Sequence, residues 1–134
     1  MVIIDTSLII DHLRQKGTKD TFLASLSLRY PDGELTVSTI TIQEIFTGKS
    51  SVYKRPLEKI ATTLASLTIV DYTLDISKLA GTLARDSKNH LQFADAAIAA
   101  TTIHHNAALA TLNRKDFAGI PHLKLLPTLQ GSTL

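Results

Sequence analysis

The chain has 134 residues, 44% of them hydrophobic and 19% charged, with a formal net charge of +2 and a pI near 9.0. This length suits a single domain, which we expect to span residues 1–134. The absence of cysteine excludes disulfides, thiolate catalysis and cysteine-ligated zinc. We find neither a bilayer-length apolar run nor a signal-peptide pattern, so we expect a cytoplasmic protein without a membrane partner. The mild basicity weakly favours an anionic partner such as RNA.

The chain opens with an apolar run of strand type that ends in polar residues, Val2-Ile3-Ile4-Asp5-Thr6-Ser7. Ligands of open α/β sheets bind outside the carboxyl ends of the strands, so an acid at that place indicates a site. Asp5 could equally be the N-cap of the helix that follows, whose apolar positions run from Leu8 to Leu13. Asp5 alone does not decide between these two interpretations.

The following segments alternate between helix and strand patterns. Residues 18–30 have helical apolar spacing and end at a Pro-Asp-Gly turn, and residues 35–39 are of strand type. A short helix is predicted over residues 40–48, with Gly48 as its C-terminal cap. Pro56 opens another helix that reaches residue 67, and residues 68–71 form a third strand.

The second half of the chain continues this alternation. The longest helix is predicted over residues 74–90, with Leu74 facing inward and Gly81 permitting close packing. An alanine-rich helix follows that could pack tightly against the sheet, with Asp95 as its N-cap or in its first turn. A fourth strand is predicted over residues 107–111, a turn over 113–117 and an edge strand over 124–126. The pattern predicts an α/β fold, a three-layer α/β/α sandwich around a mostly parallel sheet of four to five strands.

Three acids stand among apolar neighbours: Asp5 after Val-Ile-Ile, Glu44 within Ile-Gln-Glu-Ile-Phe, and Asp95 within Phe-Ala-Asp-Ala-Ala. Singly, Asp5 and Asp95 could be helix caps and Glu44 a snorkelling or salt-bridged residue. Their places relative to the strands allow all three to converge at one edge of the sheet. Converging carboxylates need protons or a cation to neutralise them. Without cysteine or an obvious histidine partner, we expect Mg²⁺ or Mn²⁺.

Four segments in order resemble the PIN domains of VapC toxins: Ile-Asp-Thr-Ser, Thr-Ile-Gln-Glu-Ile, Phe-Ala-Asp-Ala-Ala-Ile-Ala-Ala-Thr and Ala-Thr-Leu-Asn-Arg-Lys-Asp-Phe. The resemblance spans the whole chain. It implies that Asp5, Glu44 and Asp95 coordinate a divalent ion. For the fourth acidic position there are two candidates, since Asp116 could supply the acid or cap a helical turn, and the neutral Asn113 could orient a metal-bound water.

Other residues near these acids have both a functional and a structural interpretation. Three hydroxyls could hold the carboxylates by hydrogen bonds or could make local turns: Thr6, Ser7 and Thr111. Five basic residues near the predicted rim could contact RNA phosphates or could be ordinary solvated surface: Arg114, Lys115, Lys49, Lys54 and Arg55.

The resemblance implies a metal-dependent endoribonuclease that uses metal-activated water and leaves 5′-phosphate and 3′-hydroxyl ends on RNA. It also implies a toxin with a cognate VapB-type antitoxin, acting as a homodimer. The first helix and the helix over residues 54–67 are candidate dimer surfaces. Two alternatives stay open: a receiver-like, Mg²⁺-binding phosphoacceptor domain with Asp71 as the phosphorylated residue, and a catalytically inactive binding module with the same fold.

Overall fold

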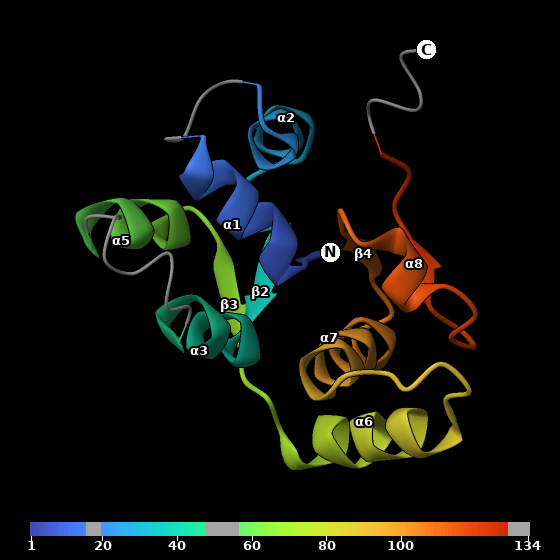
Figure 1. Cartoon of the computed structure of the whole chain (residues 1–134). Coiled ribbons are helices and arrows are strands. Elements are labelled where there is room, and N and C mark those ends of the chain that lie inside the picture. The colour runs from blue at the N-terminus through green and yellow to red at the C-terminus, as the bar shows by residue number, and fades with distance from the viewer. Residues whose placement is uncertain (16–19, 48–56, 129–134) are drawn as a thin grey trace.

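The computed structural model describes residues 1–15, 20–47 and 57–128 (Figure 1). Within these residues, five strands form one sheet in the order β3-β2-β1-β4-β5, and every neighbouring pair is parallel. The strands are β1 (Val2–Ile4), β2 (Leu35–Ser38), β3 (Thr68–Val70), β4 (Ala108–Ala110) and β5 (Lys124–Leu125). The predicted parallel sheet is confirmed, and the N-terminal strand lies at its centre.

The central strand is covered on both faces, which explains why its sequence is continuously apolar. Val2 and Ile4 pack in one core cluster and Ile3 in another, because successive strand residues point to opposite faces. Ile4 pairs with Ala110 of β4, and the amide N–H of Asp5 donates to the Ala110 carbonyl at 2.9 Å. The carboxyl ends of β1 and β4 therefore lie side by side.

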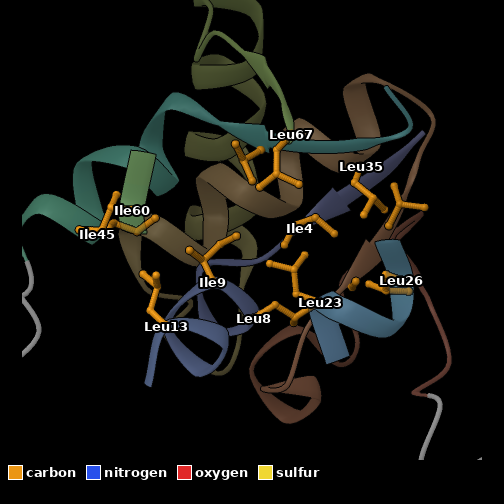
Figure 2. Close-up of a cluster of buried hydrophobic side chains, with 13 residues drawn as sticks. Ile4, Leu8, Ile9, Leu13, Leu23, Leu26, Leu35, Ile45, Ile60 and Leu67 are labelled. Atoms are coloured by element: carbon orange, nitrogen blue, oxygen red, sulfur yellow. The ribbon is translucent and has the colours of Figure 1, made fainter. Parts of the chain in front are cut away.

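Helices form a layer on each face of the sheet. The first face is covered by α1 (Thr6–Arg14), α2 (Phe22–Arg29), α3 (Thr39–Thr47) and α5 (Leu57–Ala65), and the second by α6 (Leu74–Asp86), α7 (Phe93–His104) and α8 (Arg114–Phe117). Figure 2 shows the first core, where Leu8 and Ile9 of α1 lie close to Ile4, and Ile45 of α3 lies beside Ile60 of α5. The three-layer sandwich is confirmed.

The alanine-rich helix α7 is buried between the sheet and α6. Ala99 packs with Ile3 and Leu109 of the sheet, while Ala96 and Ala100 pack against α6. Small side chains allow both approaches at once, which is the tight packing that the composition predicts. In the described residues, no helix combines the length and apolarity needed to cross a membrane.

The structure corrects several local predictions. Helix α6 ends at Asp86 rather than near residue 90, because Ser87 is extended (φ −74°, ψ 128°). Leu74 is 70% exposed, and a Cβ added at Gly81 would meet no atom within 4 Å. These two residues are seven apart and share the solvent side of α6, so the predictions of an inward Leu74 and of close packing at Gly81 were wrong.

Two expected helix signals, Gly48 and Pro56, lie outside the described residues. The start of the alanine-rich helix is described: α7 begins at Phe93 with Gln92 in the N-cap position, so Asp95 lies in the first turn and is not the cap.

Candidate active site

A cavity of about 390 Å³ opens at the carboxyl edge of the sheet, beside the ends of β1 and β4. It receives side chains from α1, from α3, from α7 and from the loop after β4. Its lining residues are Asp5, Thr6, Ser7, Ile10, Asp11, Arg14, Glu44, Asp95, Leu112 and Asn113. The structure thus brings Asp5, Glu44 and Asp95 together at one place.

Asp5 occupies the N-cap position of α1, but its carboxylate makes no capping hydrogen bond. Instead Oδ2 accepts hydrogen bonds from the hydroxyls of Ser7 and Thr111, each at 2.7 Å. Asp5 is only 3% exposed, and hydrogen bonds of this kind compensate the burial of a carboxylate. Its carboxylate is therefore held at the cavity by hydroxyls and takes no part in capping the helix.

Both hydroxyls are themselves oriented by the loop after β4. The N–H of Leu112 donates to Ser7 Oγ at 3.1 Å, and the N–H of Asn113 donates to Thr111 Oγ1 at 2.9 Å. Because a hydroxyl has one proton, an oxygen that accepts from the backbone can direct that proton to Asp5. This network fixes Asp5 relative to the loop that contains Asn113.

Glu44 comes to the same cavity from α3. Its Oε1 accepts a hydrogen bond from the Thr6 hydroxyl at 2.6 Å, and the hydroxyl oxygens of Thr6 and Thr41 lie 3.0 Å apart. Burial raises the pKa of the Glu44 carboxyl, the hydrogen bond from Thr6 acts in the opposite direction, and the charge of Asp5 adds to the rise. Glu44 is thus coupled to β1 through the residue that follows Asp5.

Asp95 is the acid whose ionisation is most affected by the site. Burial, followed by the charges of Asp5, Asp116 and Glu44, raises the pKa of Asp95 from its ordinary 3.8 to about 6. The repulsion from the other acids identifies a concentration of negative charge around Asp95.

The two candidates for the fourth position differ in placement. Asn113 lines the cavity and occupies the N-cap position of α8 without a side-chain capping bond. Asp116 is exposed in the first turn of α8 and is absent from the cavity lining, although its charge contributes to the raised pKa of Asp95.

The basic residues predicted at the rim are partly described. Arg114 and Lys115 are exposed on α8, and Arg114 Nη1 donates to the Leu126 carbonyl at 2.7 Å, which ties α8 to the segment after β5. The other three lie outside the described residues: Lys49, Lys54 and Arg55.

The sequence prediction missed five residues of the site. Ile10, Asp11, Arg14 and Leu112 line the cavity, and Thr41 contacts the Thr6 hydroxyl. A signal exists for those on α1, because Ser7, Asp11 and Arg14 are spaced by four and three residues and so share one face of that helix. Thr41 likewise precedes Glu44 by three residues on α3.

The donor chemistry of the cavity suits a hard cation. Its described lining contains four carboxylates, Asp5, Asp11, Glu44 and Asp95, against one basic side chain, Arg14. Carboxylate oxygens are the ligands that Mg²⁺ and Mn²⁺ prefer. As placed here, no three of the described acidic and histidine side chains are in position to hold one metal ion together. Joint coordination by three carboxylates therefore requires side-chain rotation.

Comparison with known proteins identifies the fold family. The PIN domain family model matches residues 2–123. The chain belongs to the PIN domain family. This PIN domain is 30% identical to Ribonuclease VapC10 of Mycobacterium tuberculosis over 127 residues, which cover 92% of this chain and 91% of that relative. The similarity to VapC toxins that the four segments indicate is confirmed.

Solved structures agree with this assignment. The PIN domain superposes with a TM-score of 0.80 and 25% identity on a chain of VapBC2 from Rickettsia felis bound to a DNA fragment from its promoter, covering 94% of this chain and 98% of that one. A toxin–antitoxin complex from Klebsiella pneumoniae gives a TM-score of 0.69 at 29% identity, with coverages of 92% and 95%.

Proposed function

We propose that this PIN domain is a Mg²⁺- or Mn²⁺-dependent endoribonuclease that acts as the toxin of a toxin–antitoxin pair. The observation that carries the proposal is the convergence of Asp5, Glu44 and Asp95 on one cavity. Family membership and the name of the relative Ribonuclease VapC10 support RNA as the substrate.

The roles of the residues follow from their surroundings. Asp5 is the anchoring ligand, because two oriented hydroxyls hold its carboxylate. Glu44 and Asp95 complete the ligand set, and Asn113 or Asp116 assists at the fourth position. A bound divalent ion would supply Lewis-acid chemistry, activating water and stabilising the leaving oxygen of the phosphodiester. Asp95, with a pKa of about 6, is mostly ionised at neutral pH and can hold a proton under mildly acidic conditions.

Water as the nucleophile makes the ribose 2′-hydroxyl unnecessary. We therefore expect products with 5′-phosphate and 3′-hydroxyl ends, and cleavage that survives a 2′-deoxy substitution at the cut site. Products with 2′,3′-cyclic phosphate ends, or loss of cleavage on 2′-deoxy substitution, would show that the 2′-hydroxyl attacks instead.

The partner part of the proposal rests on structural relatives. The proteins from R. felis and K. pneumoniae were solved as toxin–antitoxin assemblies. We infer a VapB-type antitoxin for this PIN domain and a homodimer. The predicted dimer surfaces are α1 and α5. Leu57 of α5 is an apolar side chain that is 62% exposed, as a residue of such a surface would be in one protomer.

The decisive experiment measures cleavage of total cellular RNA by the purified protein with Mg²⁺ or with EDTA. The variant Asp5→Asn keeps the side-chain shape and an oxygen for Ser7 and Thr111 but removes the charge, so we expect a folded protein with cleavage reduced at least 100-fold. The matched control Asp71→Asn changes an exposed acid outside the cavity and should cleave like the wild type. Full activity of Asp5→Asn would refute the assignment.

The same variants separate the alternatives. A receiver-like domain would be labelled by a small phosphodonor at Asp71, and the Asp71→Asn variant would lose the label. An inactive binding module would bind RNA or protein tightly without any Mg²⁺-dependent cleavage by the wild type.

A further inference from the structure

A second cavity, of about 280 Å³, adjoins the acidic one. It is lined by Ile40, Gln43, Glu44, Thr47, Phe93 and Ala94. Glu44 lines both cavities, so the two are contiguous across this side chain. Apart from Glu44, the described lining is uncharged and mostly apolar. An apolar pocket therefore opens directly beside the cluster of carboxylates.

Phe93 is the unusual residue of this pocket. It is 74% exposed, although an aromatic ring of this size is normally buried. It is the first residue of α7 and lies two positions before Asp95, so both belong to one helical turn. Other strongly exposed apolar side chains, such as Leu28 and Leu74, line neither cavity. The exposed ring of Phe93 thus lies next to the candidate active site.

Charge distinguishes this pocket from the cavity on the other side of the acids. That third cavity, of about 380 Å³, shares Asp11 and Leu112 with the acidic one and also contains Asp20. The two carboxylates there, Asp11 and Asp20, would repel a phosphate backbone. Its aromatic residue, Phe22, packs partly against the core. A nucleic-acid strand is therefore better accommodated on the Phe93 side.

We propose that Phe93 is a positioning residue on which the nucleobase next to the scissile phosphate stacks. This inference rests on RNA being the substrate. Ile40 and Ala94 supply apolar walls, and the amide of Gln43 offers a donor and an acceptor to the polar edge of the base. Stacking a base beside Asp95 places the adjacent phosphate at the carboxylates. Removing the ring should weaken binding of single-stranded RNA by about 5- to 150-fold.

Fluorescence tests the stacking directly, because the chain contains no tryptophan. Phe93→Trp, combined with Asp5→Asn to prevent cleavage, places a single reporter in the pocket. A single-stranded RNA decamer should quench this tryptophan in Mg²⁺ buffer, whereas a decamer that is abasic throughout should not. Leu28→Trp in the same background is the matched control, since position 28 is exposed but does not line the pocket, and we expect no quenching there.

The outcomes separate this inference from the proposed function. Binding of labelled RNA by anisotropy without quenching at position 93 would overturn the stacking and leave the nuclease standing. Quenching together with an inactive wild type would support the stacking and refute the nuclease. Absence of decamer binding would overturn the stacking, whereas the nuclease is decided separately by the cleavage assay on the wild type. A concentration-dependent blue shift without RNA would show that protein covers Phe93, and would also overturn the inference.

Kinetics supply a second test in the active protein. Phe93→Tyr retains a stacking ring and should keep KM for a short RNA within about twofold. Phe93→Leu retains apolar bulk but cannot stack and should raise KM with little change in kcat. Because the side chain is exposed, neither variant should alter the melting temperature. Equal KM values for the Phe93→Leu and Phe93→Tyr variants would refute a stacking role of this side chain.

Discussion

Replacing Asp95 with asparagine should stabilise the metal-free protein at neutral pH. The pKa of Asp95 is about 6 in the folded chain, against an ordinary value of 3.8. Between these pH values the folded state binds more protons than the unfolded state, so the contribution of Asp95 to stability is lost as pH rises through this window. Asparagine cannot ionise and escapes the penalty, which is complete above about pH 6.

The size of the effect follows from the same shift. A shift of one pKa unit corresponds to about 1.4 kcal/mol, so the rise of the Asp95 pKa from 3.8 to about 6 limits its effect on the free energy of unfolding to about 3 kcal/mol. Asp95 is partly exposed, and solvent screening reduces this to about 1–1.5 kcal/mol. A carboxylate in the first turn of α7 also gains about 0.5 kcal/mol from the helix dipole, which asparagine loses. The expected net gain is about 0.5–1 kcal/mol, or about 2–4 °C in Tm.

Thermal unfolding from pH 4 to pH 8, in EDTA and in Mg²⁺, measures this prediction. In EDTA, the Tm of Asp95→Asn should match the wild type near pH 4 and exceed it above pH 6. With Mg²⁺ at ten times its dissociation constant, binding adds about 1.4 kcal/mol to the free energy of unfolding of the wild type. The order of the two proteins should then reverse, because the variant has lost a ligand.

Two results would refute this reasoning. If Asp95→Asn were less stable than the wild type at pH 8 in EDTA, burial and repulsion by the neighbouring acids would not raise the pKa of Asp95 in the folded protein. If Mg²⁺ stabilised both proteins equally, Asp95 would not be a ligand. Asp71→Asn, at an exposed acid outside the cavity, controls for the general effect of removing a negative charge.

Two further predictions concern the hydrogen bonds and the packing behind the site. Thr111→Val removes the hydroxyl that donates to Asp5 and should weaken Mn²⁺ binding, measured by calorimetry, about 10- to 100-fold. The control is Thr101→Val, which removes a hydroxyl that bonds within α7. Equal Mn²⁺ affinities of the two variants would contradict a role of Thr111 in holding Asp5. Ala99→Leu should overpack α7 against the sheet and lower the urea-derived unfolding free energy by about 1–3 kcal/mol, whereas the exposed Ala61→Leu should not. An unchanged free energy for Ala99→Leu would show that this interface can repack freely.

Much of the fold could be predicted because it depends on local patterns. The apolar run Val2–Ile4 is covered on both faces, and the alanines of α7 are small where two layers meet it. Errors occurred where apolar spacing is ambiguous. Leu74 looks like a core residue in the sequence, but Ile76 and Ala80 already define the buried side of α6, and Leu74 falls outside it.

The sequence by itself determined the kinds of groups at the site and their order along the chain. An acid after the first strand, a second on α3 and a third at the start of α7 are all visible without coordinates. The tertiary structure decided what surrounds each acid. Thr111 donates to Asp5 across 106 residues, and this contact depends on the parallel pairing of β1 with β4.

The exposure of Phe93 beside Glu44 also depends on packing, because the sequence pattern of an exposed aromatic residue does not differ from that of a buried one. Residue types are a property of the chain, whereas contacts between distant residues exist only once strand register and helix packing are formed. The sequence therefore determines the chemistry that is possible at the sheet edge, and the fold determines which side chains take part in it.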